Sequence, residues 1–166
     1  METRFLKRLL LLCFLVLMLF GASRAFAAGT GERRLGLGVG IPNAVVVFRP
    51  SPFEFKGGYD FTEGEEYVFL SGDYLLIDAR PVAPPLRFSL GLGAYGKLLL
   101  GDSDGDGDED SDLEGGVRLP VGFSVRTRNE FAELFVQLSP GLDFYPKLTF
   151  SDQPLQVWAG FTLQLD

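Results

Sequence analysis

Residues 117–144 constrain the fold of this chain more than any other segment, because apolar and polar side chains alternate through them with a period of two. Such alternation places the apolar side chains on one face of a β-strand and the polar ones on the other. A short polar turn at residues 127–130 divides the segment into two arms, so the pattern predicts a β-hairpin. Each arm is roughly 9 to 13 residues long, the length of a tilted strand that crosses a bilayer.

The two faces of this hairpin differ in chemistry. One face includes Arg118, Ser124, Arg126 and Glu133, and Phe135 is the one large apolar residue on it. The opposite face consists of Val117, Leu119, Val121, Phe123, Val125, Ala132, Leu134, Val136, Leu138, Leu142 and Phe144. One side of the hairpin is therefore suited to an apolar environment and the other to partners that can pair with charge.

Residues 1–27 have the features of a cleaved signal peptide. Arg4, Lys7 and Arg8 precede an apolar run at residues 9–20, and Ala25-Phe26-Ala27 supplies the small-x-small cleavage pattern. The run is too short to span a bilayer as a helix, although an uncleaved anchor is the alternative. We expect residues 28–166 to form a single mature domain without a disulfide, because the lone Cys13 leaves with the peptide.

The charge of the expected mature chain is concentrated in one place. Residues 28–166 contain 11 basic and 21 acidic residues, a net charge of −10. Eight of the acids lie between Asp102 and Glu114, so the rest of the chain is close to neutral. Nothing in this distribution makes a basic face, and we therefore expect no nucleic-acid partner.

The remaining mature chain contains six further segments with strand patterns, at residues 34–41, 44–49, 53–61, 67–77, 86–98 and 155–165. A turn at residues 50–52 and a proline-rich stretch at 79–85 separate some of them, and we expect that stretch to end the strand before it. Residues 100–115 and 145–154 are expected to be loops. No mature segment has helical periodicity, so the predicted fold is all-β, an eight-stranded antiparallel up-and-down barrel.

The polar face of the strands decides between a soluble barrel and a transmembrane one. A soluble lipocalin-like barrel turns its apolar face inward and presents many charges to water, whereas a membrane barrel turns its apolar face to lipid. Here the polar face combines glycines with few charges of both signs, which suits a crowded interior. The interior acids are expected to pair with Arg87, Arg118 and Arg126. These acids are Glu54, Asp73, Glu133 and Asp143.

Aromatic residues near the ends of strands add to the membrane interpretation. They include Phe53, Phe61, Phe131, Phe144 and Tyr145. Transmembrane barrels carry girdles of aromatic side chains at both membrane interfaces. We therefore predict a transmembrane barrel, and a soluble barrel with an apolar interior is the alternative.

Several segments resemble one family of membrane proteins. These are LGLGVG (35–40), GDYLL (72–76), LRFSLGLGAYGKL (86–98), RLPVGFSV (118–125) and ELFVQLSPGLDFYP (133–146). They resemble the small outer-membrane β-barrel proteins of spirochaetes and related bacteria, whose eight-stranded barrel is of the OmpA transmembrane type. The resemblance implies this fold and this location, and no shared enzymatic activity. The final residues FTLQLD depart from the aromatic ending usual for such strands, and the acidic loop is longer than expected.

Motifs for nucleotide binding and catalysis fail on inspection. Residues 91–97 match GxGxxG and the start of GxxxxGK, but residue 98 is Leu where a phosphate loop needs Ser or Thr, and the stretch keeps strand periodicity. The absence of histidine and of a mature cysteine excludes Ser-His-Asp and Cys-His arrangements and ordinary zinc sites. Only carboxylate chemistry remains, and ion pairing is the favoured role for the interior acids. We expect no nucleotide, no resident cofactor and no enzymatic activity.

The acidic loop carries the one candidate metal site. Its acids alternate as D-x-D-x-D-G-x-x-D, a spacing that lets successive carboxylates converge on one calcium ion. The candidate ligands are Asp102, Asp104, Asp106, Asp108 and Asp110. Position twelve of a helix-loop-helix calcium loop should be Glu and is Leu113 here, so we expect weak binding, with a Kd on the order of 10⁻⁴ to 10⁻³ M. The alternative is a solvated acidic tip without a bound ion.

These observations leave three functional hypotheses. We favour a monomeric protein of the cell outer membrane that contacts lipid and has a structural or surface-interaction role, with its acidic loop exposed to envelope or host surface molecules. With the N-terminus in the periplasm, residues 102–114 and 145–154 face outward. A narrow ion-conducting pore and a soluble periplasmic carrier of an apolar ligand are the two alternatives.

Overall fold

The computed structural model describes residues 31–41, 43–60, 67–99, 113–145 and 149–165, and these residues form nine β-strands. The strands are β1 (Arg33–Ile41), β2 (Ala44–Pro50), β3 (Phe53–Asp60), β4 (Tyr67–Ala83), β5 (Leu86–Leu99), β6 (Leu113–Arg118), β7 (Val121–Arg126), β8 (Ala132–Tyr145) and β9 (Thr149–Leu165). Within these ranges no helix has the length and apolar character needed to span a membrane. The expected all-β class is confirmed.

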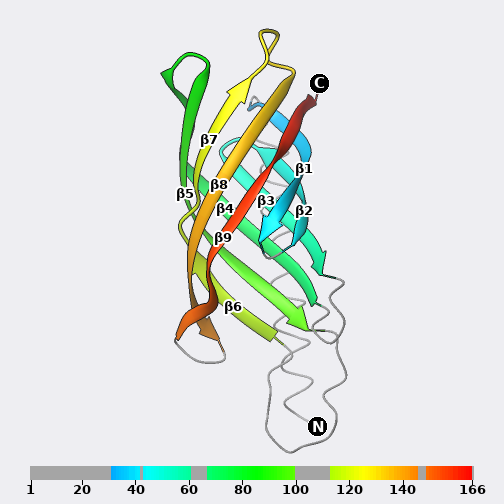
Figure 1. Ribbon diagram of the computed structural model, residues 1–166, viewed down its shortest axis with the longest axis vertical. Coiled ribbons are helices and arrows are strands. Elements are labelled where there is room, and N and C mark those ends of the chain that lie inside the picture. Colours follow the sequence, from blue (N-terminus) through cyan, green and yellow to red (C-terminus); the bar gives the residue numbers. More distant parts are fainter. Residues whose placement is uncertain (1–30, 42, 61–66, 100–112, 146–148, 166) are drawn as a thin grey trace, which may run out of the picture.

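The strands form one antiparallel sheet that closes on itself (Figure 1). Strand β1 pairs with β2 on one side and with β9 on the other, so the first and last strands are neighbours. Both β6 and β7 pair with β5 on one side and with β8 on the other, at different heights. They therefore occupy one position in the ring, and the hydrogen bonds pass through eight strand positions, as predicted.

The ring is irregular rather than an even barrel, and one cause is Pro120. A single strand was expected over residues 117–126, and this is wrong because β6 ends at Arg118 and β7 begins at Val121. Proline has no N–H to donate, so it interrupts a strand that lies between two neighbours. The chain crosses the gap with other bonds: the Leu119 N–H donates to the Pro140 carbonyl at 3.0 Å, and the Gly91 N–H donates to the Pro120 carbonyl at 2.8 Å.

A second irregularity lies in the hairpin of β4 and β5. The proline-rich residues 79–85 were expected to close the ladder, but β4 continues to Ala83 with register shifts between Leu75 and Ile77 and again further along. The pairing of β3 with β4 ends at Tyr74, so the rest of β4 has a partner on one side only. An edge of this kind tolerates Pro81, because the missing N–H is not needed for a second ladder.

The last strand also begins earlier than expected. Residues 145–154 were predicted to be a loop, whereas β8 reaches Tyr145 and β9 starts at Thr149. Residues 149–150 already pair with β8, at Asp143 and Leu142. Strand β9 is 17 residues long as a result, and it runs beside β8 along one side of the ring (Figure 1).

The two faces of the sheet differ in chemistry. Large apolar side chains such as Leu37, Leu76 and Leu134 lie on the exposed outer face. Charged side chains such as Arg118 and Glu54 are fully buried on the inner face. Soluble proteins almost never bury charged residues completely unless they are paired. The interior of the ring must therefore contain the partners of its charges.

Candidate functional site

The buried charges of the interior centre on two carboxylates, of which Glu54 on β3 is the first. The Arg49 Nε donates to Glu54 Oε2 at 2.6 Å, and the Gln137 Nε2 donates to Glu54 Oε1 at 2.8 Å. The Lys56 ammonium also pairs with Glu54. All four side chains are buried. A carboxylate with this number of donors is fully satisfied, and hydrogen bonds to an ionised group are the strong ones.

Glu133 on β8 is the second centre. Its carboxylate lies 2.7 Å from Arg126 Nε, 2.8 Å from Arg49 Nη1 and 3.4 Å from Arg34 Nε. Arg49 contacts both Glu54 and Glu133, so its guanidinium joins β2, β3 and β8 across the interior of the ring. Strands that are not neighbours in the sheet are thereby held at a fixed distance.

Asp73 on β4 and Arg118 on β6 form a third group. The guanidinium grips the carboxylate as a fork: Arg118 Nε donates to Asp73 Oδ1 at 2.8 Å, and Nη2 donates to Oδ2. A further Arg118 nitrogen donates to Gln156 Oε1 at 3.1 Å. The Lys56 Nζ lies 3.6 Å from Asp73 Oδ2 and also pairs with Glu54, so it links this group to the first centre. These three groups therefore form one connected network.

The sequence predicted part of this network. The pairs Arg118–Asp73 and Arg126–Glu133 are confirmed. Three parts of the expectation are wrong. Arg87 pairs with the exposed Glu130 at the end of the ring, Asp143 accepts a hydrogen bond from the Tyr95 hydroxyl, and Glu54 pairs with Arg49 and Lys56 rather than with an expected arginine.

Three interior cations were missed as partners, namely Arg34, Arg49 and Lys56. The sequence could have revealed the first of these cations. Residues two apart in a strand face the same side, and Arg34 is two residues before Gly36, so it lies on the inner face of β1. No comparable signal was available for Arg49, since the valine-rich β2 showed no clear polar face.

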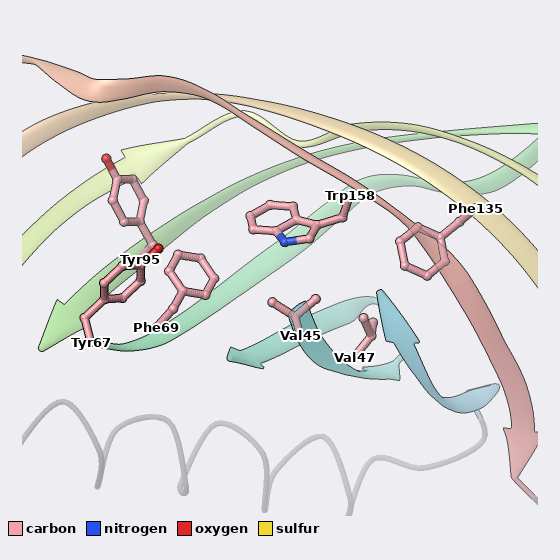
Figure 2. Close-up of a cluster of buried hydrophobic side chains, with 7 residues drawn as sticks. All are labelled: Val45, Val47, Tyr67, Phe69, Tyr95, Phe135 and Trp158. Atoms are coloured by element: carbon pink, nitrogen blue, oxygen red, sulfur yellow. The ribbon is translucent and has the colours of Figure 1, made fainter. Parts of the chain in front are cut away.

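The interior also contains a cluster of aromatic and aliphatic side chains (Figure 2). Phe69, Tyr95 and Trp158 come from β4, β5 and β9 and are almost completely buried. The ring centroid of Phe69 lies 5.6 Å from that of Trp158 and 6.3 Å from that of Tyr95. Figure 2 shows Tyr67 beside Phe69, and Phe135 further along near Val45 and Val47. The alternation pattern left Phe135 as an exception on the polar face, and it did not predict this cluster.

Cations of the network stack on the aromatic rings. The Arg118 guanidinium lies 5.2 Å from the Trp158 ring centroid and 5.8 Å from that of Phe69. The Lys56 Nζ lies 5.6 Å from the Trp158 ring centroid. Desolvated contacts of this type contribute about 2 kcal/mol. The Trp158 Nε1 donates to the Asn43 carbonyl at 3.2 Å, which satisfies its one polar group. Charged and aromatic layers therefore pack as one filled interior.

Glycines on the inner face make room for these rings. A methyl group at Gly116 would lie 2.8 Å from Tyr95 Cζ, and one at Gly141 would lie 3.2 Å from the same ring. A methyl group at Gly38 would lie 3.3 Å from Phe135 Cζ. These distances are shorter than ordinary contact between carbon atoms. The glycine alternation read from the sequence thus has a packing role, since bare backbone on one strand receives the aromatic ring of another.

The described interior offers ion pairing rather than acid–base chemistry. Glu54, Asp73 and Glu133 are each held by at least two cations, so among the described residues these acids do not form a free carboxylate pair. The described ranges also contain no group of three acidic, histidine or cysteine side chains that could hold a metal ion. The expected calcium ligands at residues 102–110 and the signal peptide at residues 1–27 lie outside the described residues, and both stay predictions.

Comparisons with known proteins add no family assignment. Neither a family model, nor a curated protein, nor a solved structure matches the chain. The resemblance to spirochaete outer-membrane proteins is therefore carried by the quoted segments alone. The function must be argued from the ring itself.

Proposed function

We propose that this protein is an outer-membrane β-barrel protein with a structural or surface-interaction role. The observation that carries the proposal is a continuous row of exposed apolar side chains around the ring. Register partners connect Val46 on β2 to Leu37 on β1, then to Phe161 on β9, Leu134 on β8, Val125 on β7 and Leu86 on β5. All six side chains are exposed.

A row of this extent needs an apolar environment. Monomeric proteins in water rarely expose contiguous apolar patches larger than a few hundred Å², and larger patches mark membrane or protein contacts. Burial of such a surface in lipid stabilises the protein by about 25 cal/mol for each Å² removed from water. A ring that is apolar on six neighbouring strands and charged inside fits a lipid bilayer better than it fits water.

The height of the apolar band supports the same proposal. Phe131 lies just before β8 and Phe144 near its other end, and both rings are exposed. Thirteen residues separate them, about 44 Å along an extended strand. A tilt of about 40° reduces this separation to about 34 Å along the membrane normal. That distance is close to the thickness of the hydrocarbon core, so the two rings are suited to opposite interfaces.

The filled interior argues against the two alternatives. A pore needs a continuous path for ions, whereas Arg118, Lys56 and Trp158 lie side by side inside the ring and are buried. A carrier of apolar ligands needs an apolar interior, whereas this one contains a connected network of charges. The structural or surface-interaction role therefore remains the favoured one, with residues 102–114 on the outer side of the membrane.

Fractionation of the cells that produce the protein tests this proposal. The protein should stay with the outer membrane after carbonate extraction and should change its gel mobility on heating, as folded barrels do. A tag inserted at Gly105 should be accessible on intact cells. Release with the soluble proteins would overturn the membrane assignment. Protection of the tag until the envelope is broken would instead reverse the topology and leave the membrane assignment intact.

A further inference from the structure

A cavity of about 290 Å³ opens at the end of the ring where the β4–β5 and β7–β8 connections lie, the upper end in Figure 1. It lies apart from the aromatic layer, and most of its lining residues take no part in the interior network. The lining residues are Pro81, Pro84, Pro85, Leu86, Arg87, Arg126, Thr127, Arg128 and Glu130. Two connections far apart in the sequence thus line one space that is open to the outside.

The backbone on both sides of this cavity is strained and held in place. Ala79 and Glu130 have positive φ angles of 43° and 58°, and within the described ranges they are the non-glycine residues that do so. A left-handed conformation of this kind costs on the order of 1 to 3 kcal/mol and collects at binding sites. Arg87 connects the two strained residues: Nη2 donates to Glu130 Oε1 at 2.8 Å, and Nη1 to the Ala79 carbonyl at 3.5 Å. The Arg87 side chain therefore holds the β4–β5 and β7–β8 connections together.

The charges of the lining leave one cation without a partner. Arg87 pairs with Glu130, and Arg126 pairs with Glu32 and Glu133. Arg128 is exposed and has no ion-pair partner among the described residues. Its guanidinium keeps its donors open in a planar fork. Two of the three lining arginines are thus neutralised by carboxylates, and among the described residues Arg128 is the lining cation left to pair with an anion.

We propose that this cavity binds a small monocarboxylate with an apolar body. The planar fork of Arg128 matches a carboxylate, which it would hold with two parallel hydrogen bonds. The rings of Pro84 and Pro85 would cover the apolar part of the ligand. Glu130 disfavours a second negative charge, and a volume near 290 Å³ is at the small end of ligand sites. The ligand is therefore a small monoanion rather than a phosphate or a polymer.

This inference goes beyond the proposed function and does not depend on it. The proposed membrane topology would place the cavity in the periplasm, since the β4–β5 and β7–β8 turns lie at the end of the ring opposite the end of β5 at Leu99 and the start of β6 at Leu113. Binding itself depends only on the folded ring, and it can be measured on purified full-length protein in detergent micelles. A failure to bind would leave the membrane assignment untouched, and a failure of the fractionation test would leave the binding result valid.

The test is a titration with 3-phenylpropionate, with the uncharged 3-phenylpropanol as its matched control. Both compounds partition into micelles, and only the acid can pair with Arg128. Calorimetry should show saturable binding of the acid to the protein at millimolar concentration. The alcohol should give only the heat that it gives with micelles that contain no protein. Arg128→Gln should weaken binding of the acid about tenfold or more, because a hydrogen-bonded charge is lost. Arg128→Lys should fall between the two, since an ammonium lacks the fork.

Arg80→Gln is the control variant for general charge effects, because Arg80 is an exposed arginine of β4 that does not line the cavity. It should bind the acid as the native protein does. The heat-dependent gel mobility of each variant reports whether it is folded. Equal binding of acid and alcohol, or undiminished binding by a folded Arg128→Gln protein, would overturn the site.

Discussion

Two adjacent residues of β8 show the two environments of this molecule. The Glu133 side chain points into the ring, has no exposed surface and contacts three arginines. The Leu134 side chain points outward and is 66% exposed, and its ladder partners Val125 and Phe161 are exposed as well. Two consecutive residues of one strand therefore lie in different surroundings: Glu133 has defined charged partners, and Leu134 has none.

The contrast teaches which forces act on each face. Inside, a charge is tolerated because defined partners on other strands neutralise it, so the identity of each residue matters. Outside, the side chains need only an apolar neighbour, and in the proposed bilayer lipid would supply it for any apolar residue of suitable size. Substitutions should therefore be judged by face and by depth rather than by hydrophobicity, and three comparisons test this rule in order of expected size.

The largest effect is expected from Glu133→Gln. The substitution keeps the shape of the side chain but leaves Arg34, Arg49 and Arg126 without their shared carboxylate. Removal of one partner from a buried pair costs about 3 to 5 kcal/mol, because the remaining charge stays buried. Urea unfolding of the protein in lipid vesicles measures the change in the free energy of unfolding.

Glu130→Gln is the matched control for that experiment. Its carboxylate pairs with Arg87 at 2.8 Å, but its side chain is 56% exposed, and an exposed pair contributes about 1 kcal/mol or less. A Glu133→Gln protein as stable as the Glu130→Gln protein would show that water reaches the interior network and screens it.

A smaller effect is expected from Leu134→Arg on the outer face. If this face contacts lipid, an arginine near the middle of the membrane costs about 2 to 4 kcal/mol of stability. Leu165→Arg, at the end of β9, is the control for depth and should cost about 0 to 1 kcal/mol because its charge reaches the interface. The same unfolding measurement serves both variants. Changes within about 0.5 kcal/mol for both would indicate a face exposed to water, and the soluble alternative would then gain.

The sequence could predict the features that depend on local patterns, and it could not predict those that depend on contacts between distant residues. Alternation is local, so the faces of β3 and β8 and the inward position of Glu54 and Glu133 could be predicted. The contact of Arg49 with Glu133 joins residues 84 positions apart. It depends on the closure of the ring, which a local sequence pattern cannot predict. The partners of the interior charges could therefore be predicted only in part.

The remaining errors have physical causes of the same kind. Pro120 is buried on the inner face, and its effect on the ladder depends on having strands on both sides, so the break between β6 and β7 was missed. Conversely, Pro81 was expected to end β4 and does not, because no second strand pairs there. The binding cavity was unpredictable for a further reason, since it forms between two connections that meet only in the folded ring.

The smallest effect tests the two faces with one chemical change, the loss of a tyrosine hydroxyl. The Tyr95 side chain is 2% exposed, and its hydroxyl donates to Asp143 Oδ1. Tyr95→Phe keeps the ring that packs against Gly116 and Gly141 and removes only this donor. The buried Asp143 then lacks a hydrogen bond, which should cost about 1 to 3 kcal/mol.

Tyr74→Phe makes the same change on the outer face of β4, where the side chain is 48% exposed. It should alter stability by no more than about 0.5 kcal/mol. A double-mutant cycle of Tyr95→Phe with Asp143→Asn assigns the inner cost to the hydrogen bond, and a coupling of about 0.5 to 3 kcal/mol is expected. No coupling would mean that water replaces the hydroxyl without loss. The interior would then be hydrated at the aromatic layer, and the contrast between the two faces would rest on the ion pairs alone.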